Sequence, residues 1–211
     1  MPCKTLHVVD IHRKMKRTSG AVHILNQSLP LVPIAAIFPS GAHAMMTVPI
    51  VIDFEASGFG KGSYPIEVGY SRRHGEGWCT LIKPESDWQH WDIHAARIHR
   101  IPREILVERG KSASLVTEQL NTQLAGMTVY TDGWTQDYVW MALLYDAADR
   151  VPSFRLADLR EIISPQQEGL WHATKDQVQE DLHISRHRAS NDARILQMTW
   201  LRTYDAVRCH G

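Results

Sequence analysis

The sequence predicts an α/β fold in which a sheet of five strands carries helices on its faces. Three short strand-like segments come first and are separated by turns, whereas the second half of the chain alternates helical and strand-like segments. A run of strands followed by alternating helices and strands is typical of a sheet with helices packed against it. The chain has 211 residues, 44% of them hydrophobic, which suffices for one domain with a packed core.

The first half of the chain contains three predicted strands. Residues 48–54 are a short, nearly continuous apolar run, as expected of a central strand that is buried on both faces. The segment 57–63 is rich in glycine and predicts a loop. Residues 66–71 alternate apolar with polar or small side chains, and residues 78–82 follow a glycine-containing turn. These three strands are expected to form an antiparallel meander.

The second half of the chain contains most of the predicted helices. Residues 87–109 are irregular and partly helical. Val116, Leu120 and Leu124 recur every four residues and define one face of a helix that Gly126 ends. The remaining elements follow in order: a strand at 127–131, a helix at 138–148, a short strand at 154–159, and helices at 166–183 and 189–205.

The N-terminal residues differ in character from the rest. A basic cluster, an apolar run at 29–38 and an A-x-A sequence copy the order of a secretory signal. Two prolines interrupt the apolar run, which is also too short to span a bilayer. We therefore expect Met45 or Met46 to be the natural start. The expected organisation is an N-terminal extension at 1–46, one folded domain at 47–206 and a tail at 207–211.

Charge and cysteine content narrow the functional classes. The 23 basic and 23 acidic residues give a formal net charge of +0, which argues against a large non-specific nucleic-acid surface but not against a small active-site cleft. The three cysteines, Cys3, Cys79 and Cys209, are far apart and odd in number. This pattern predicts free thiols in a reducing compartment, and we expect a cytoplasmic protein. No membrane partner is expected.

Four carboxylates and one imidazole lie at or near the ends of predicted strands and helices, where catalytic or metal-binding side chains often occur. Asp53 and Glu55 are two positions apart on the first strand and therefore share a face. Asp137 lies between the fourth strand and a helix, and His187 precedes Asp192 at the start of the last helix. Separately, each position has an ordinary explanation: solvated strand-end acids, an acid favoured by a helix dipole, and a surface-loop histidine. In one pocket, the carboxylates would repel unless cations such as Mg²⁺ or Mn²⁺ neutralised them.

In this order, the segments resemble the DEDDh group of the DnaQ-like 3′–5′ exonucleases, which includes proofreading subunits, ribonuclease T and oligoribonuclease. Residues 50–58 (IVIDFEASG) resemble the first motif, and residues 64–69 (YPIEVG) are similar to the I-x-E-I-G second strand. Residues 98–101 (IHRI) resemble the H-G-I element, with Arg100 where glycine is usual. Residues 132–137 (DGWTQD) resemble N-S-x-x-Q-D, with Asp132 replacing asparagine, and residues 187–192 (HRASND) fit H-x-A-x-x-D.

The resemblance implies a fold and an activity. The implied fold is ribonuclease H-like: a mixed five-stranded sheet with antiparallel strands 1–3, then parallel strands 4–5, and helices on both faces. The implied activity is metal-dependent 3′–5′ exonucleolytic release of nucleoside 5′-monophosphates from single-stranded DNA or RNA 3′ ends, with two Mg²⁺ or Mn²⁺ ions. Several members of the family dimerise, which leaves a homodimer open.

The resemblance also implies residue roles. Asp53, Glu55 and Asp192 would bind one metal ion directly, Asp53 would bridge to the second, and Asp137 would act mainly through bound water. His187 would be the general base, a role that suits an imidazole because it titrates near neutral pH. Since base stacking on aromatic rings tolerates any sequence, residues near the motifs are expected to bind the terminal nucleotide. The substrate-binding candidates are Ala56, Ser57, Phe59, His99 and Trp134.

Two alternatives remain at this point. The first is a binding module that holds a nucleic-acid end or a polymerase partner without cleaving. The intact set of five motif residues argues against it. The second is an oligoribonuclease-like hydrolase of very short RNAs.

Overall fold

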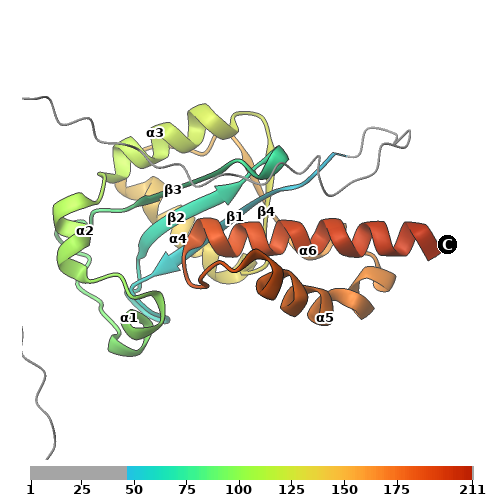
Figure 1. The fold of residues 1–211 in the computed structure, drawn as a ribbon. Helices are drawn as coiled ribbons and strands as arrows, with labels where there is room; N and C mark the ends of the chain where they lie inside the picture. Colours follow the sequence, from blue (N-terminus) through green and yellow to red (C-terminus); the bar gives the residue numbers. More distant parts are fainter. Residues whose placement is uncertain (1–46, 211) are drawn as a thin grey trace, which may run out of the picture. The chain divides into compact units, whose positions relative to one another are not determined.

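The computed structural model describes residues 47–210, which contain one five-stranded sheet. Figure 1 shows the helices and strands of this fold. The expected N-terminal extension, residues 1–46, lies outside the described residues. The strands are β1 (Ile50–Ala56), β2 (Pro65–Ser71), β3 (Gly77–Leu81), β4 (Thr128–Thr131) and β5 (Arg155–Asp158). Their spatial order is β3-β2-β1-β4-β5. β1, β2 and β3 pair antiparallel, whereas β4 pairs parallel with both β1 and β5. The predicted mixed sheet is therefore confirmed.

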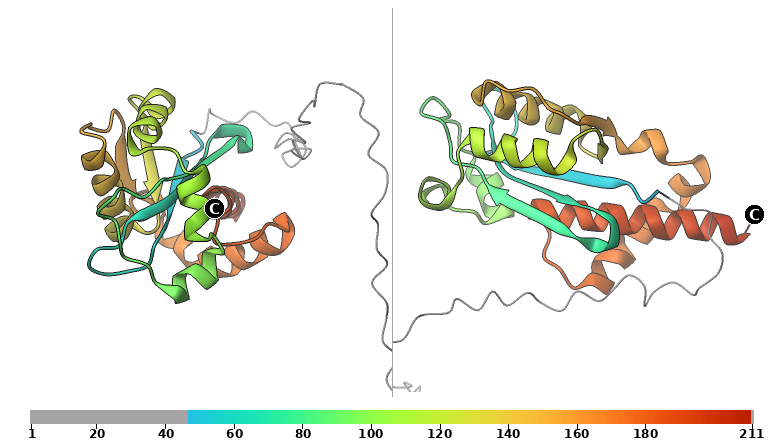
Figure 2. Two further views of the ribbon diagram at one scale, coloured as in Figure 1. Left: turned by 90° about the vertical axis from the view of Figure 1, so that its left-hand side faces the viewer. Right: turned by 90° about the horizontal axis from the view of Figure 1, so that it is seen from above.

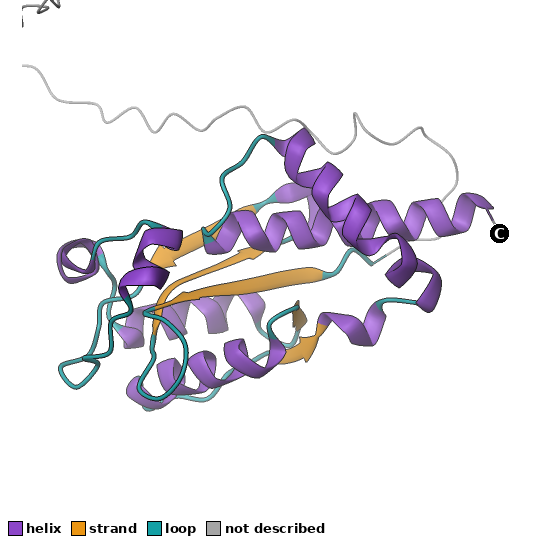
Figure 3. Ribbon diagram, turned by 90° about the horizontal axis from the view of Figure 1, so that it is seen from below, coloured by secondary structure: helices purple, strands orange, loops and turns teal. Residues whose placement is uncertain are grey.

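Helices cover both faces of the sheet, as Figures 2 and 3 show. On one face, α3 (Ala113–Leu124) and α4 (Trp134–Ala147) pack over the even-numbered residues of β1, Ile52 and Phe54. On the other face, α5 (Pro165–Leu182) and α6 (Ala189–His210) pack around Val51. The remaining helices are α1 (Ile93–His99), α2 (Arg103–Arg109) and the 3-10 helices η2 (Arg73–Gly75) and η3 (Leu159–Ile162). β1 is thus buried on both sides, as its apolar run predicts.

Two helices differ from the predicted boundaries. α4 begins at Trp134 rather than at residue 138, which places Asp137 inside its first turn. α6 continues to His210, so the predicted end at residue 205 is wrong, and residues 207–210, expected in the tail, belong to the helix. Neither glycine nor proline interrupts residues 189–210, so nothing in the local sequence stops this helix earlier.

α6 contacts the sheet at two places, through Gln197 and through its first turn. The side-chain amide of Gln197 donates to the carbonyl oxygens of Pro49 (2.7 Å) and Ser71 (3.1 Å), at the start of β1 and the end of β2. Nearer the start of the helix, a Cβ placed on Gly69 would lie 2.4 Å from the backbone nitrogen of Ser190. Glycine at this position therefore lets the first turn of α6 lie directly against β2.

Two further expectations concern the described residues. No helix within residues 47–210 combines the length and apolar character that a bilayer crossing needs. Cys79 and Cys209 are exposed free thiols, as the sequence predicts, and Cys3 lies outside the described residues.

Candidate active site

Asp53 lies at the centre of β1, and Glu55 lies near its C-terminal end. Both are half-buried, whereas Phe54 between them is buried in the core on the opposite face. Asp53 and Glu55 therefore point toward the face that α5 and α6 cover, as the alternation predicts. Because β1 and β4 run parallel, the segment after β4 reaches the same edge of the sheet as these two acids.

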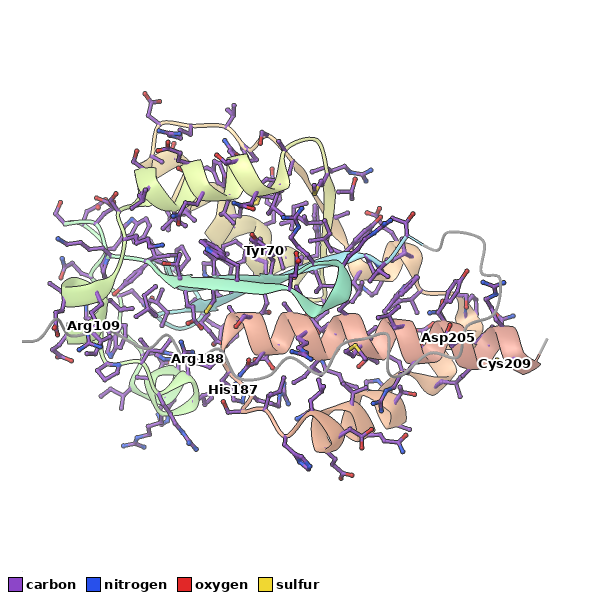
Figure 4. All side chains as sticks on the ribbon, turned by 45° about the horizontal axis from the view of Figure 1, so that its top comes forward. Tyr70, Arg109, His187, Arg188, Asp205 and Cys209 are labelled. Atoms are coloured by element: carbon purple, nitrogen blue, oxygen red, sulfur yellow. The ribbon has the colours of Figure 1, made fainter. Side chains whose placement is uncertain are left out.

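His187 lies just before the N-terminal end of α6, as Figure 4 shows. Together with Asp192, it lines a pocket that Asp53 and Glu55 also line. Asp192 is in the first turn of α6, and its carboxylate accepts the backbone N–H of His187 at 2.7 Å. His187 adopts a left-handed backbone conformation with φ of 63°. Arg186 lies on the other side of Asp192, with its Nε 3.6 Å from Oδ1. The turn and the helix thus orient the imidazole and the carboxylate together.

The loop between β4 and α4 positions Asp137. Its carboxylate is buried and accepts a hydrogen bond from the Thr131 hydroxyl at the end of β4. That hydroxyl also accepts the N–H of Gly133 at 3.1 Å. A Cβ on Gly133 would lie 3.0 Å from Oδ2 of Asp137, so glycine provides the room for the carboxylate.

The structure brings the five motif residues to two adjoining pockets. Ligand atoms of Glu55, His187 and Asp192 all lie within 4.8 Å of one another, a spacing that can hold a metal ion. Asp53 and Glu55 line both pockets together with His187. Asp137 lines the larger pocket, of about 420 Å³, and Asp192 lines the smaller, of about 180 Å³. We call the larger of these two the apolar pocket and the smaller the acidic pocket.

Burial and mutual repulsion raise the pKa of three of these acids. Burial, followed by the carboxylates of Asp137 and Glu55, raises the pKa of Asp53. Burial and the Asp192 carboxylate raise the pKa of Glu55 to about 8. Burial raises the pKa of Asp137 to about 7, against the opposing hydrogen bond from Thr131. Near neutral pH, the site therefore retains protons that a divalent cation would displace.

The five predicted substrate-binding residues separate into two groups. Ala56, Phe59 and His99 line the apolar pocket. Ser57 does not: it is buried, and its hydroxyl accepts the N–H of Tyr64 at 3.1 Å and contacts Nδ1 of His90 at 3.0 Å. Trp134 is not among the residues that line the apolar pocket; it packs against the core, with its ring centroid 5.4 Å from that of Tyr138. Ser57 and Trp134 therefore shape the fold around the pocket instead of lining it.

His99 and Arg100 form the C-terminal end of α1. His99 is buried, and its Nδ1 accepts the N–H of Ile101 at 3.1 Å. Its Nε2 has no hydrogen-bond partner among the described residues, and burial lowers its pKa, which keeps the ring neutral. Arg100 is the C-cap of α1 and adopts φ of 56°, a left-handed conformation that glycine adopts most readily.

Sequence reasoning missed several residues of the two pockets. Trp140 and Ile98 line the apolar pocket, and Lys175 and Arg186 line the acidic pocket. One signal was available for Trp140: it follows Asp137 by three positions on a helix, and residues at this spacing share a face. Lys175 pairs with Asp132 at 3.3 Å, and a contact between α5 and the β4–α4 loop has no local signature in the sequence.

A larger pocket of about 570 Å³ lies at the other end of β1. Thr47, Ile50 and Trp200 are among the residues that line it, and none of the five motif residues does. Although this pocket is larger than the apolar and acidic pockets, we assign it no role in catalysis.

Comparison with known proteins supports the fold. No family model and no curated protein matches the chain. E. coli exonuclease I in complex with a 5cy-dA13 oligonucleotide is 12% identical, with a TM-score of 0.54 over 76% of this chain and 42% of that chain. The zinc-bound exonuclease I–ssDNA complex is also 12% identical, with a TM-score of 0.57 over 75% and 40%. A product-bound exonuclease I structure is 13% identical, with a TM-score of 0.54 over 76% and 46%.

These similarities concern architecture. The chain spans less than half the length of these exonuclease I structures. At this level of identity, the shared property is the fold: a mixed five-stranded sheet with helices, similar to the ribonuclease H-like fold of exonuclease I.

Proposed function

We propose that this chain is a metal-dependent 3′–5′ exonuclease that releases nucleoside 5′-monophosphates from single-stranded DNA or RNA ends. The observation that carries the proposal is the convergence of Glu55, His187 and Asp192, whose ligand atoms lie within 4.8 Å of one another. Asp53 and Asp137 line the adjoining apolar pocket. The fold shared with exonuclease I, whose structures include complexes with single-stranded DNA, supports the same reading.

The donor set fits two divalent cations of the Mg²⁺ or Mn²⁺ type. Carboxylate oxygens are the ligands that these hard cations prefer. The charged groups that act on Asp53, those of Asp137, Glu55, Asp192 and Asp132, are themselves carboxylates and raise its pKa. Cations would relieve this repulsion, so the electrostatics of the site favour metal binding.

The residues of the chain supply the remaining chemistry. Divalent cations, when bound, make water acidic enough to yield hydroxide near neutral pH and stabilise charge on a phosphodiester. His187, beside Glu55 and Asp192, accepts the proton of the attacking water. The apolar pocket, which Phe59 and Ile98 line, holds the terminal nucleoside and excludes water from its base. Cleavage then releases that nucleoside with its 5′-phosphate.

The proposal is tested with a 3′-labelled oligonucleotide in Mg²⁺, in Mn²⁺ and in chelator. Label release by the wild-type chain should require metal, Asp53→Asn should abolish it, and His187→Ala should lower its rate by about 10²–10⁴-fold, as expected for a lost general base. Full activity of Asp53→Asn in a folded protein would refute the proposal. Binding of the oligonucleotide without any metal-dependent loss of label would favour a non-cleaving binding module.

The length of the preferred substrate separates the remaining alternative. A panel of single-stranded DNA and RNA, with di- and trinucleotides, measures kcat/KM for each. A preference for dinucleotides would favour the oligoribonuclease-like reading over release from long single strands. The homodimer and the cytoplasmic location stay predictions, and sedimentation measures the first of them.

A further inference from the structure

Glu67 of β2 is a buried carboxylate that binds the start of α6. Its side chain is 1% exposed. Nε of Arg188 lies 3.1 Å from both carboxylate oxygens, and Nη2 lies 2.6 Å from Oε1. The backbone N–H of Ala189 also donates to Oε2 at 3.0 Å. One carboxylate therefore fixes two consecutive residues at the N-terminus of the helix.

These two residues directly follow His187. The His187 N–H in turn donates to the Asp192 carboxylate at 2.7 Å. Gly69, two positions after Glu67 on the same face of β2, allows Ser190 to approach the strand. A continuous set of contacts thus runs from β2 through Arg188 and Ala189 to the segment that carries His187 and, through the His187 N–H, to the Asp192 carboxylate.

Stability alone does not account for this arrangement. Glu67 lies directly opposite Glu55 in the β1–β2 register, so its negative charge adds to that of an acidic site. The Arg188 side chain is 45% exposed, so solvent screens the pair and limits its net contribution to stability, whereas its geometry stays specific. A bidentate guanidinium–carboxylate pair is among the most directional contacts that a protein makes.

We propose that Glu67 and Arg188 are a positioning pair that fixes the start of α6 on β2, so that His187 and Asp192 face Glu55. Neither residue contacts the substrate or the reacting atoms in this proposal. The assignment deepens the proposed nuclease function and rests on it only for the kinetic measurement.

The first test uses the metal-free protein. Hydrogen exchange of the His187 and Ala189 amides is measured in the wild type, Glu67→Gln, Arg188→Met and Arg188→Lys. Arg188→Met should lose the protection of both amides, and Arg188→Lys should retain part of it. The matched control is Arg202→Met. Arg202 lies farther along α6 and pairs with Asp181 of α5 at 2.5 Å, so its loss should leave both amides protected.

The second test measures Mn²⁺ affinity by electron paramagnetic resonance. Glu67→Gln and Arg188→Met should weaken Mn²⁺ binding by about 10- to 100-fold, the usual effect of removing a group that orients a metal ligand. In the nuclease assay, the same variants should lower kcat with little change in KM. Arg202→Met should match the wild type in both measurements.

The outcomes separate this inference from the proposed function. Wild-type amide protection and Mn²⁺ affinity in folded Glu67→Gln and Arg188→Met would overturn the positioning pair. Glu67→Gln is nearly isosteric, so it keeps the test decisive if Arg188→Met does not fold. Loss of protection and of Mn²⁺ affinity, in a chain whose wild type cleaves no oligonucleotide, would support the pair and refute the nuclease.

Discussion

Two aromatic residues of the apolar pocket differ in burial, and this difference separates substrate binding from folding. Phe59 is 70% exposed, whereas Trp140 is 5% exposed and donates from its indole nitrogen to the Ser63 hydroxyl at 3.0 Å. Their ring centroids lie 5.8 Å apart. Trp140 is therefore part of the core, and Phe59 is the ring that is available to a nucleobase.

Replacing Phe59 with alanine should weaken substrate binding without affecting the fold. Stacking of a base on an aromatic ring contributes about 1–3 kcal/mol, so Phe59→Ala should raise KM for a single-stranded oligonucleotide by about 10-fold. Because the ring is exposed, the melting temperature should stay near that of the wild type. Steady-state kinetics and thermal denaturation measure the two effects.

Val151 provides the matched control. It is 79% exposed and does not line the apolar or the acidic pocket. Val151→Ala should leave both KM and the melting temperature unchanged. An unchanged KM in Phe59→Ala would remove this ring from the binding site.

At the scale of secondary-structure elements, α6 approaches β2 so closely that the contact requires a glycine. Gly69 and Gly77 are both strand glycines, but their surroundings differ. A Cβ on Gly69 would lie 2.4 Å from the Ser190 nitrogen, whereas the nearest atom to a Cβ on Gly77 is 3.8 Å away. Backbone atoms cannot rotate aside as a flexible side chain can. A side chain at position 69 would therefore force α6 or β2 to move.

Gly69→Ala should therefore displace the start of α6. Overpacking of this kind typically costs about 1–3 kcal/mol of unfolding free energy. Because His187 and Asp192 lie at that helix end, Mn²⁺ affinity should fall as well. Urea denaturation and Mn²⁺ titration measure both effects, with Gly77→Ala as the control. Equal behaviour of the two variants would contradict the close approach.

The element boundaries show what local patterns can and cannot predict. Alternation along β1 correctly predicted that Asp53 and Glu55 share a face, because a strand's side-chain period depends on its own backbone. The start of α4 was placed four residues late. Its first turn, Trp134 to Asp137, is stabilised by the N-terminal glycine and by the Asp137 contact with Thr131, not by an apolar stripe. Helix ends of this kind depend on capping contacts that hydrophobic periodicity does not report.

At the scale of the whole molecule, the order of the motifs predicted the fold, which the sheet topology confirms, and five residues that line two adjoining pockets and whose roles stay predictions. It did not predict the contacts that hold them. Glu67 and Arg188 are 121 positions apart, and Ser63 and Trp140 are 77 apart. A single sequence carries no record of which distant residues pair, so contacts of this range become visible only in the folded chain. The hydroxyl partners of Ser57, Tyr64 and His90, could not be predicted for the same reason, and its role in substrate binding stays a prediction.

The shifted pKa values of three buried groups lead to a pH dependence of the stability of the whole molecule. The raised pKa values of Glu55 (about 8) and Asp137 (about 7) mean that the native state holds protons that the unfolded chain releases above about pH 4. Stability contributed by such groups falls as pH rises, because the native state binds more protons. Buried His99 has a lowered pKa and acts in the opposite direction, but only below about pH 6.5, where an unfolded histidine becomes protonated.

The effect of the carboxylates on stability is therefore best measured between about pH 6.5 and about pH 8.5. In this range the carboxylates titrate, and His99 no longer contributes. In chelator, the unfolding free energy from urea denaturation should fall across this window, and Asp137→Asn should flatten the decline. Mn²⁺ should stabilise the protein increasingly toward high pH, because the cation replaces the protons that the carboxylates lose. Unfolding free energy that rises with pH in chelator, or that Mn²⁺ leaves unchanged, would mean that the five residues do not form one electrostatic unit. The metal-dependent chemistry proposed for them would then lose its physical basis.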